Sequence, residues 1–555
     1  MRWNLLTLSL LVGCKNDQET VAEGLSAASS PVLSVSTPER ASWNAQGAAT
    51  MTGNISEIDT ILVNGEAHAV SGASFAVPVD LARGINTFET EAISLDGKSL
   101  FDRRSVLAGS FAPAEGDITG AVGARVNQGG LDDGAEIVAG MVDAQSINKS
   151  IGALNPVVDL EYSLGTGISV DLNSVFFDAP MVDLIAGDGA LAVEVILPDL
   201  LVDADADASV LWIDSEHNLE LTASYAVVSA DLTLGLQDGV VVAGLENTVV
   251  ALENFAYDVS LLPGDFIEDN VFSDTIREAI EERLAGEMQT LLPEAITSLQ
   301  EGLDLSFKTE LLGTAVDLGA GFSDIGVDGG GVWVGLDLTV DAGGTDLSGD
   351  GYLTGGMTLP EADTTADAAV MMADDVINRA MYELWLGGVL SQTLSTADGS
   401  LSPDALSSFG LTEATVTTDA ALPPVLVGTD GGGMALQLGE VTVALETPSF
   451  SLGNSLVVRV AGSVGLGLSY SDGAVAPQLS DVGLSFDIVE TDWEQDQEAI
   501  VNLLESFITP DLLLGAVDGL ALELPSLDGL SIDNATVTRA DSGVHSDLRL
   551  DISAN

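Results

Sequence analysis

Residues 455–470 read SLVVRVAGSVGLGLSY, with an apolar or small residue at all eight even positions from Leu456 to Tyr470. Side chains of a β-strand alternate between its two faces, so these residues share one face. At ~3.3 Å per residue such a strand would reach roughly 50 Å. Ordinary strands are far shorter. The stretch therefore predicts a highly twisted sheet or an elongated barrel.

Other segments from residue 117 onward follow the same pattern. Leu219 to Leu236 alternates, with a change of phase at Val227 and Val228 that predicts a β-bulge. Val334 to Val340 predicts a further strand. Long alternating strands therefore dominate this part of the chain.

Four segments have apolar residues at helical spacing instead. They begin at Leu131, Ile276, Met372 and Ile500, and Pro510 ends the last one. A helix, long strands and a second helix follow one another, and this order occurs twice, with the halves meeting near residue 310. The pattern predicts an internally duplicated α+β chain.

Four stretches resemble the tubular lipid-binding (TULIP) superfamily, in particular the bactericidal/permeability-increasing protein, lipopolysaccharide-binding protein and cholesteryl ester transfer protein. They are residues 124–132, 228–235, 374–390, and 503–510 with 522–525. The resemblance implies two elongated, highly twisted β-barrels, each packed on long helices and joined by a central sheet in a boomerang shape. It places the barrels at residues 117–310 and 311–555, each with an apolar slot for acyl chains.

The apolar stripes of the first three helical segments are the expected lipid contacts, although the same residues could simply fill a core. They are Leu131, Val138, Val142, Ile276, Ile280, Leu284, Met372, Val376, Ala380 and Leu384. Apolar tails would be held by buried area, at ~0.8 kcal/mol per CH₂.

Two departures from the resembled family narrow the expected ligand. Cys14 is the only cysteine, so the disulfide that members often carry in the first barrel cannot form. Residues 117–310 contain only five Lys or Arg residues, so a cationic tip that grips lipopolysaccharide phosphates is not expected. Phospholipid tails, fatty acids or neutral lipids are the expected partners.

Residues 32–112 predict a small β-sandwich, with turn signals at Asn64-Gly65 and Asp96-Gly97. The order of these motifs resembles the immunoglobulin-like (Ig-like) accessory domain of glucodextranases. The resemblance implies a spacer or adhesion module.

The N-terminus has the parts of a secretory signal: Arg2, an apolar run from Leu5 to Val12, and the end Gly13-Cys14. That ending resembles the lipobox of bacterial lipoproteins. It implies removal of residues 1–13 and acylation of Cys14 by palmitate-like chains, with residues 14–31 as a flexible tether. The expected location is a bacterial membrane, with the outer membrane favoured, facing the periplasm or the cell surface.

The chain is strongly acidic, with 86 Asp and Glu against 16 Lys and Arg and a net charge of −70. This charge disfavours nucleic acid as a partner. It leaves two interpretations, calcium binding or a solvated acidic surface. Asp203, Asp205 and Asp207 resemble the start of a calcium loop, but Ala208 replaces the glycine that such a loop requires.

Catalytic motifs do not emerge from the sequence, and no cofactor is expected. The run from Gly321 to Gly326 has the wrong spacing for a nucleophile elbow, and His68, His217 and His545 share no ligand spacing. A lipoprotein that binds lipids, with lipid transfer as a further expectation, is the leading hypothesis. The alternative is a surface adhesion or scaffold lipoprotein with filled barrels and the Ig-like domain as its contact module, and a glycan-acting enzyme is a third.

Overall fold

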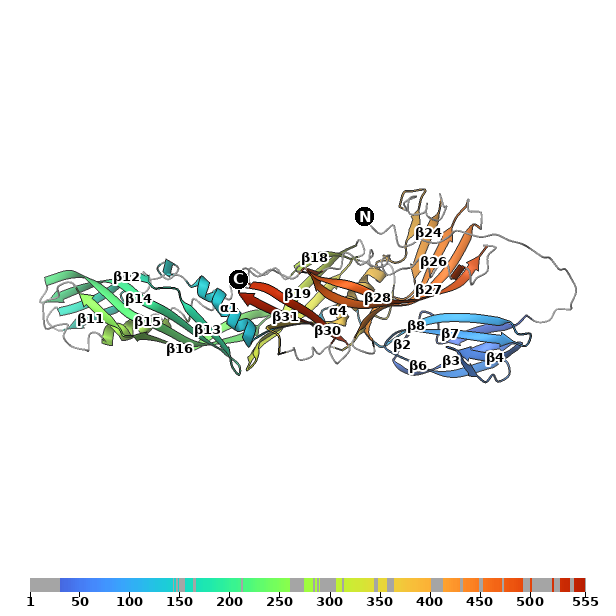
Figure 1. Ribbon diagram of the computed structural model, residues 1–555, viewed down its shortest axis with the longest axis horizontal. Coiled ribbons are helices and arrows are strands. Elements are labelled where there is room, and N and C mark those ends of the chain that lie inside the picture. The colour runs from blue at the N-terminus through green and yellow to red at the C-terminus, as the bar shows by residue number, and fades with distance from the viewer. Residues whose placement is uncertain are drawn as a thin grey trace.

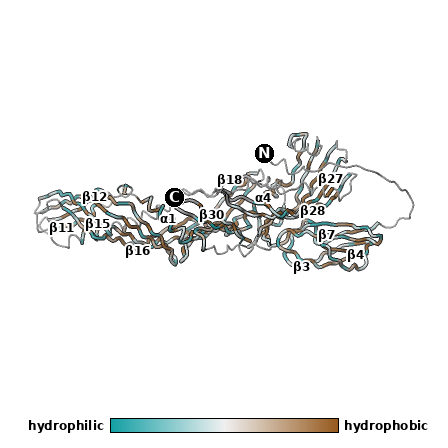
Figure 2. Tube along the Cα trace, viewed as in Figure 1, coloured by the Kyte–Doolittle hydropathy of each residue, from teal (hydrophilic) through white to brown (hydrophobic). Residues whose placement is uncertain are grey.

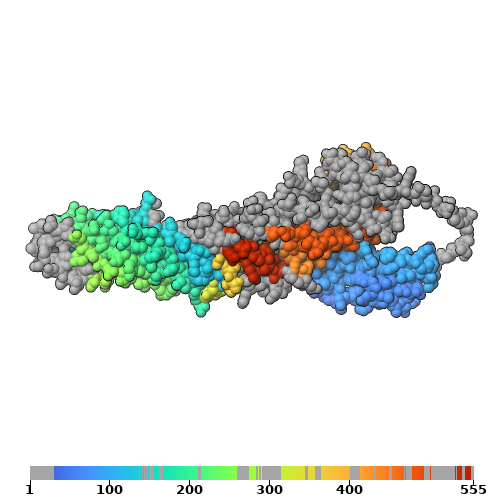
Figure 3. All heavy atoms as spheres, in the orientation of Figure 1, coloured from blue at the N-terminus to red at the C-terminus, as the bar shows by residue number. Residues whose placement is uncertain are grey.

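The protein is elongated (Figures 1 and 3). It has a curved β-sheet towards each end and a central sheet between them, and a β-sandwich formed by the N-terminal strands lies beside one of the two curved sheets. This computed structural model describes residues 30–142, 144–145, 148, 155–162, 166–210, 213–259, 274–282, 285–286, 289, 306–311, 314–343, 348–356, 364–400, 413–429, 433–448, 453–471, 474–492, 500–501, 522–523, 530–539 and 544–554. Cys14, Leu284 and the stretch 503–510 lie outside these residues. The α+β class is confirmed, with strands forming most of the described chain.

The first strands form a two-layer β-sandwich. Its core contains Met51, Ile61, Phe75 and Phe88. Turns are present at both predicted positions, since Asn64, Gly65 and Gly97 have positive φ. One sheet has the order β1 (Val32–Thr37), β3 (Gly47–Ser56), β6 (Ser74–Leu81), and the other β2 (Trp43–Asn44), β8 (Ser99–Ala108), β7 (Gly84–Ser94), β4 (Ile58–Val63), β5 (Glu66–His68).

The sheet at the far end is strongly curved, and we call it the first curved sheet. Its strands follow the order β11 (Val158–Tyr162), β12 (Thr166–Phe176), β14 (Leu191–Val210), β15 (Ile213–Gln237), β16 (Val240–Glu253), while β13 (Met181–Ala186) pairs with β14 and β17 (Ala256–Val259) with β15. Within the described residues the strand order does not close on itself, so the expected barrel is an open half-barrel.

The central sheet joins segments from both halves of the sequence. Its order is β18 (Ser306–Leu311), β19 (Thr314–Asp328), β20 (Gly331–Asp341), β10 (Ile118–Asn127), β22 (Ala368–Ala373), β31 (His545–Ala554), β30 (Leu530–Arg539). Because β10 lies between β20 and β22, the start of the predicted first barrel belongs to this shared sheet.

The second curved sheet lies at the sandwich end. Its order is β23 (Thr393–Ser395), β24 (Thr415–Ala420), β26 (Met434–Glu446), β27 (Ser455–Ser471), β28 (Ala474–Thr491), β29 (Leu522–Glu523), with β25 (Val425–Gly428) on β26. A short pair, β9 (Ser110–Ala112) with β21 (Tyr352–Thr354), follows the sandwich in the chain.

At three of the four predicted places the structure describes a helix of nine or more residues. These are α1 (Gln128–Met141), the helical residues 274–282, and α4 (Asp374–Leu386). At the fourth, only Ile500 and Val501 are described, and both are helical. Met372 was wrongly assigned to the third helix, because it lies in β22 and the helix begins only at Asp374.

Apolar and polar residues alternate along the long strands (Figure 2), with one interruption that the sequence pattern missed and one that it placed wrongly. In β27 the buried positions shift from Leu456 and Val458 to Ala461 and Val464, so the predicted even face is broken. In β15 the phase changes between Ala223 and Ala226, ahead of the predicted bulge. Bulges and twist rotate the strand, and periodicity alone does not locate them.

The sandwich packs against the second curved sheet rather than extending away from it (Figure 1). Leu107 of β8 lies in one buried cluster with Leu353 of β21 and Val425 of β25. The side-chain amide oxygen of Gln437 accepts a hydrogen bond from the Ile85 amide at 2.7 Å. Trp43 and Trp385 bring their ring centroids within 5.8 Å. The expected spacer is therefore docked on the body of the protein.

Candidate functional site

A buried apolar cluster lies between the inner face of the first curved sheet and the helices above it, α1 and the helical residues 274–282; we call this inner face the trough. Buried side chains from β11 to β16 form its floor, and the helices pack against the same cluster. Inward and outward side chains alternate along each strand, which keeps the carboxylates on the other face. The floor includes Val170, Leu172, Val202, Leu219, Leu221 and Val228.

Several floor positions carry alanine. Ala204 and Ala206 of β14, and Ala223 and Ala226 of β15, all lie in the buried cluster. The alanine side chain is a single methyl group, so it does not reach the helices. The space above these positions must be filled by larger side chains from the helices or by another apolar group. In this structure the side chains of Ile276 and Ile280 contact the floor and are buried.

The start of α1 is fixed to both neighbouring sheets. The Gln128 side chain donates to the Leu184 carbonyl at 2.7 Å and accepts from the Ala186 amide at 3.0 Å, so it bonds along β13. A β-carbon on Gly130 would lie 2.6 Å from the Asp367 carbonyl oxygen, so this close approach requires glycine. These contacts set the height of α1 above the sheet.

Side-chain amides and a carboxylate satisfy backbone groups of the strands that form the trough. Asn148 and Asn155 each bond a β12 residue through both its amide and its carbonyl, at Val175 and Leu172. Glu281 accepts from the Leu252 amide at 2.9 Å. These backbone groups beside the buried cluster are therefore paired.

The structure brings together only part of the predicted lipid-contact set. Val138, Val142, Ile276 and Ile280 contact the trough cluster. Leu131 lies beyond its end, in a buried cluster shared with Leu232 and the central-sheet residue Val327.

The α4 residues contact a different part of the protein. Ala380 and Leu384 are buried with Ile118 and Leu338 of the central sheet, and Val376 packs on the same cluster. They do not belong to the apolar cluster of the second curved sheet, which centres on Val416, Leu445, Leu456, Val458 and Phe486. The predicted second slot is therefore not built from the α4 stripe.

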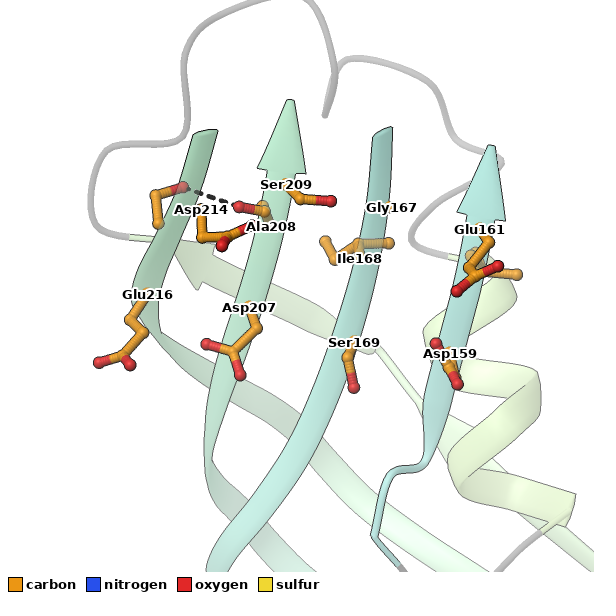
Figure 4. A pocket seen from close by; sticks show the side chains of 12 residues that line it. Asp159, Glu161, Gly167, Ile168, Ser169, Asp207, Ala208, Ser209, Asp214 and Glu216 are labelled. Carbon is orange, nitrogen blue, oxygen red and sulfur yellow. Dashed lines mark hydrogen bonds between the residues drawn. The ribbon is translucent and has the colours of Figure 1, made fainter. Parts of the chain in front are cut away.

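The outer face at the tip of the first curved sheet is acidic. Asp159, Ser169, Asp207 and Glu216 are successive cross-strand partners and point to the same side (Figure 4). With their neighbours they line an open depression of about 570 Å³. In the described part of the chain no group of three or more His, Cys, Asp or Glu residues is arranged to hold a metal ion. The Asp203–Asp207 segment is a strand with one solvent-exposed face.

Sequence reasoning missed the floor of the trough, because it selected candidate contacts from helices alone. The alternation over Leu219 to Leu236 carried the signal for the inward positions. Gln128 and Asn155 gave no comparable signal, since their role depends on strand edges distant in sequence.

Comparisons with known proteins show likeness in structure but not in sequence. No protein-family model matches the chain, and no curated protein sequence matches it. Among solved structures, the chain is similar to the crystal structure of lipopolysaccharide binding protein, at a TM-score of 0.42 and 12% sequence identity. The match covers 78% of this chain and 99% of that chain. Identity at this level does not transfer residue roles from one chain to the other.

Proposed function

We propose that this protein binds lipid acyl chains in the trough of the first curved sheet. The observation that carries the proposal is a floor of apolar side chains, several of them alanine, that faces two helices and is separated by the sheet from the acidic outer surface. Such a site offers buried area and no directed polar contacts, which suits fatty acids, phospholipid tails or neutral lipids. The proposed activity is therefore lipid binding without catalysis.

We also propose that the protein is a bacterial lipoprotein anchored through acylated Cys14. The Gly13-Cys14 ending of the signal-like segment supports this proposal. Among the residues that the structure describes, no helix is long and apolar enough to cross a bilayer. Mass spectrometry of the membrane-extracted protein tests this proposal. We expect Cys14 to carry two or three acyl chains and residues 1–13 to be absent.

Uptake of a fluorescent fatty acid by the delipidated, non-acylated chain tests the binding proposal. The change Ala226→Leu enlarges a fully buried floor residue and should weaken uptake at least tenfold, because it occupies space that an acyl chain would need. Thr222→Leu, on the exposed face of the same strand, is the matched control and should leave uptake unchanged.

The adhesion alternative makes a different prediction for the same proteins. If the trough is a permanently filled core, the wild-type chain takes up no probe and Ala226→Leu only lowers its melting temperature. Retained probe uptake in Ala226→Leu, with a normal melting temperature, would place the binding elsewhere.

A further inference from the structure

An apolar row crosses the outer, solvent-facing side of the first curved sheet. Met181, Ile196, Val227 and Ala251 are successive cross-strand partners on β13, β14, β15 and β16. Their neighbours along each strand are buried in the trough, so these four side chains lie on the opposite face. Met181 is 54% exposed, and the adjoining Tyr225 is 40% exposed.

The row contrasts with the rest of the same face. Farther along β14, the outward positions are Asp203, Asp205 and Asp207, as expected of a strand with one solvated side. At Ile196 the outward position becomes apolar, and the partners on both sides are apolar as well. Met181 is exposed and Ile196, Val227 and Ala251 are half-buried. A contiguous, partly exposed apolar row on such an acidic surface indicates an interaction site.

Carboxylates flank the row on both sides. Asp183 and Glu194 are cross-strand partners in the next outward row, two residues along each strand. Glu253 pairs with Tyr225 on the other side. All three acidic residues are solvent-exposed. The surface therefore presents an apolar stripe between two negative borders.

We infer that this outer apolar row docks a protein partner whose surface carries an apolar stripe between Lys or Arg residues, as on one face of a cationic amphipathic helix. The carboxylates beside the row favour a partner with positively charged residues beside its apolar stripe. A second copy would set carboxylates against carboxylates, and acidic lipid headgroups would be repelled by a chain of net charge −70.

The dimensions of the row suit a short helix. Four strands at spacings of ~4.8 Å span about 14 Å, the length of roughly nine residues of α-helix. An interface of that extent is small, so the contact is of the transient kind. The inference goes beyond lipid binding, because the trough occupies the other face of the same strands.

Binding of a synthetic helical peptide, with a leucine stripe flanked by lysines, tests the docking surface. At physiological ionic strength the full chain should bind this peptide more tightly than a serine-for-leucine peptide of equal charge. The double variant Ile196→Thr with Val227→Thr keeps β-branched residues in the strands and should weaken binding at least tenfold. Fatty-acid uptake by this variant should stay at the wild-type level.

The sandwich supplies a matched control. Leu95 and Phe101 are 68% and 60% exposed on the same acidic protein, and the double variant Leu95→Ser with Phe101→Ser should bind the peptide like the wild type. Equal binding of both peptides, or equal loss in both double variants, would overturn the inference. Row-dependent self-association in sedimentation, or row-dependent binding to phosphatidylcholine vesicles without peptide binding, would also overturn it in favour of a second copy or a membrane.

Discussion

Glu440 is the residue on which the docking of the sandwich depends most directly. Its side chain is 3% exposed, and it lies in β26 where the register with β27 shifts and its own φ is +53°. Arg40 Nη1 donates to both carboxylate oxygens at 3.1 Å, and Arg459 Nε lies 3.1 Å from Oε2. The Ser105 amide donates to Oε1 at 2.6 Å. One carboxylate thus joins two strands of the second curved sheet to the sandwich.

The change Glu440→Gln removes this charge and leaves two arginines facing a neutral amide. Loss of one partner from a buried ion pair costs ~3–5 kcal/mol. We expect a cost of ~3 kcal/mol, at the low end of this range, because Arg40 and Arg459 are partly exposed and keep second carboxylates at Asp102 and Asp487. A loss of that size should raise the rate of local opening at the interface by about 100-fold.

Hydrogen–deuterium exchange at the Ser105 amide measures this opening. Glu446→Gln on the same strand is the matched control, since Glu446 is exposed and its substitution should leave the exchange rate unchanged. If Glu440→Gln exchanges no faster than the control, the carboxylate does not hold the sandwich in place, and the reasoning is refuted.

Three further changes probe other contacts. Leu353→Ala should open a cavity in the cluster shared with the sandwich and cost ~2–5 kcal/mol, seen as faster exchange at Leu107. Gly331→Ala would set its β-carbon 2.1 Å from the Val126 carbonyl oxygen and should lower the melting temperature, whereas Gly321→Ala meets nothing within 4 Å and should not. The hydrogen bond from Arg125 lowers the pKa of Asp328 from 3.8 to about 2. Because this pKa is depressed on folding, the pair stabilises above about pH 4 and loses its effect towards pH 2, by at most ~1 kcal/mol since the Asp328 side chain is 49% exposed. The Asp328→Asn variant should lack that acid dependence in urea unfolding.

Local pattern predicted the elements well where one face of a strand or helix is buried. The Asn64-Gly65 turn, the strand over Leu219 to Leu236 and the helical face of Ile276 and Ile280 are confirmed, because each depends on neighbouring residues. The predicted position of the bulge in β15 was wrong, and the unbroken even face predicted for β27 is interrupted, since bulges depend on the partner strand.

Contacts between distant segments lay beyond the sequence pattern. Nothing local marks Glu440 as buried, since its partner Arg40 is 400 residues away. The α4 stripe was assigned to a second slot, yet Leu384 packs on the central sheet, because the arrangement of sheets decides which face a helix covers. The trough floor and the outer apolar row became visible only when strand register placed β13 to β16 side by side.

Photocrosslinking with a diazirine-labelled fatty acid tests the central claim most directly. The delipidated, non-acylated chain would be labelled, digested and mapped by mass spectrometry to single residues. Lipid binding in the trough predicts label on inward residues such as Ala226 and Val228, with little on the outward Thr222 of the same strand. Label confined to outward positions, or no saturable label in β14 and β15, would contradict the proposed function.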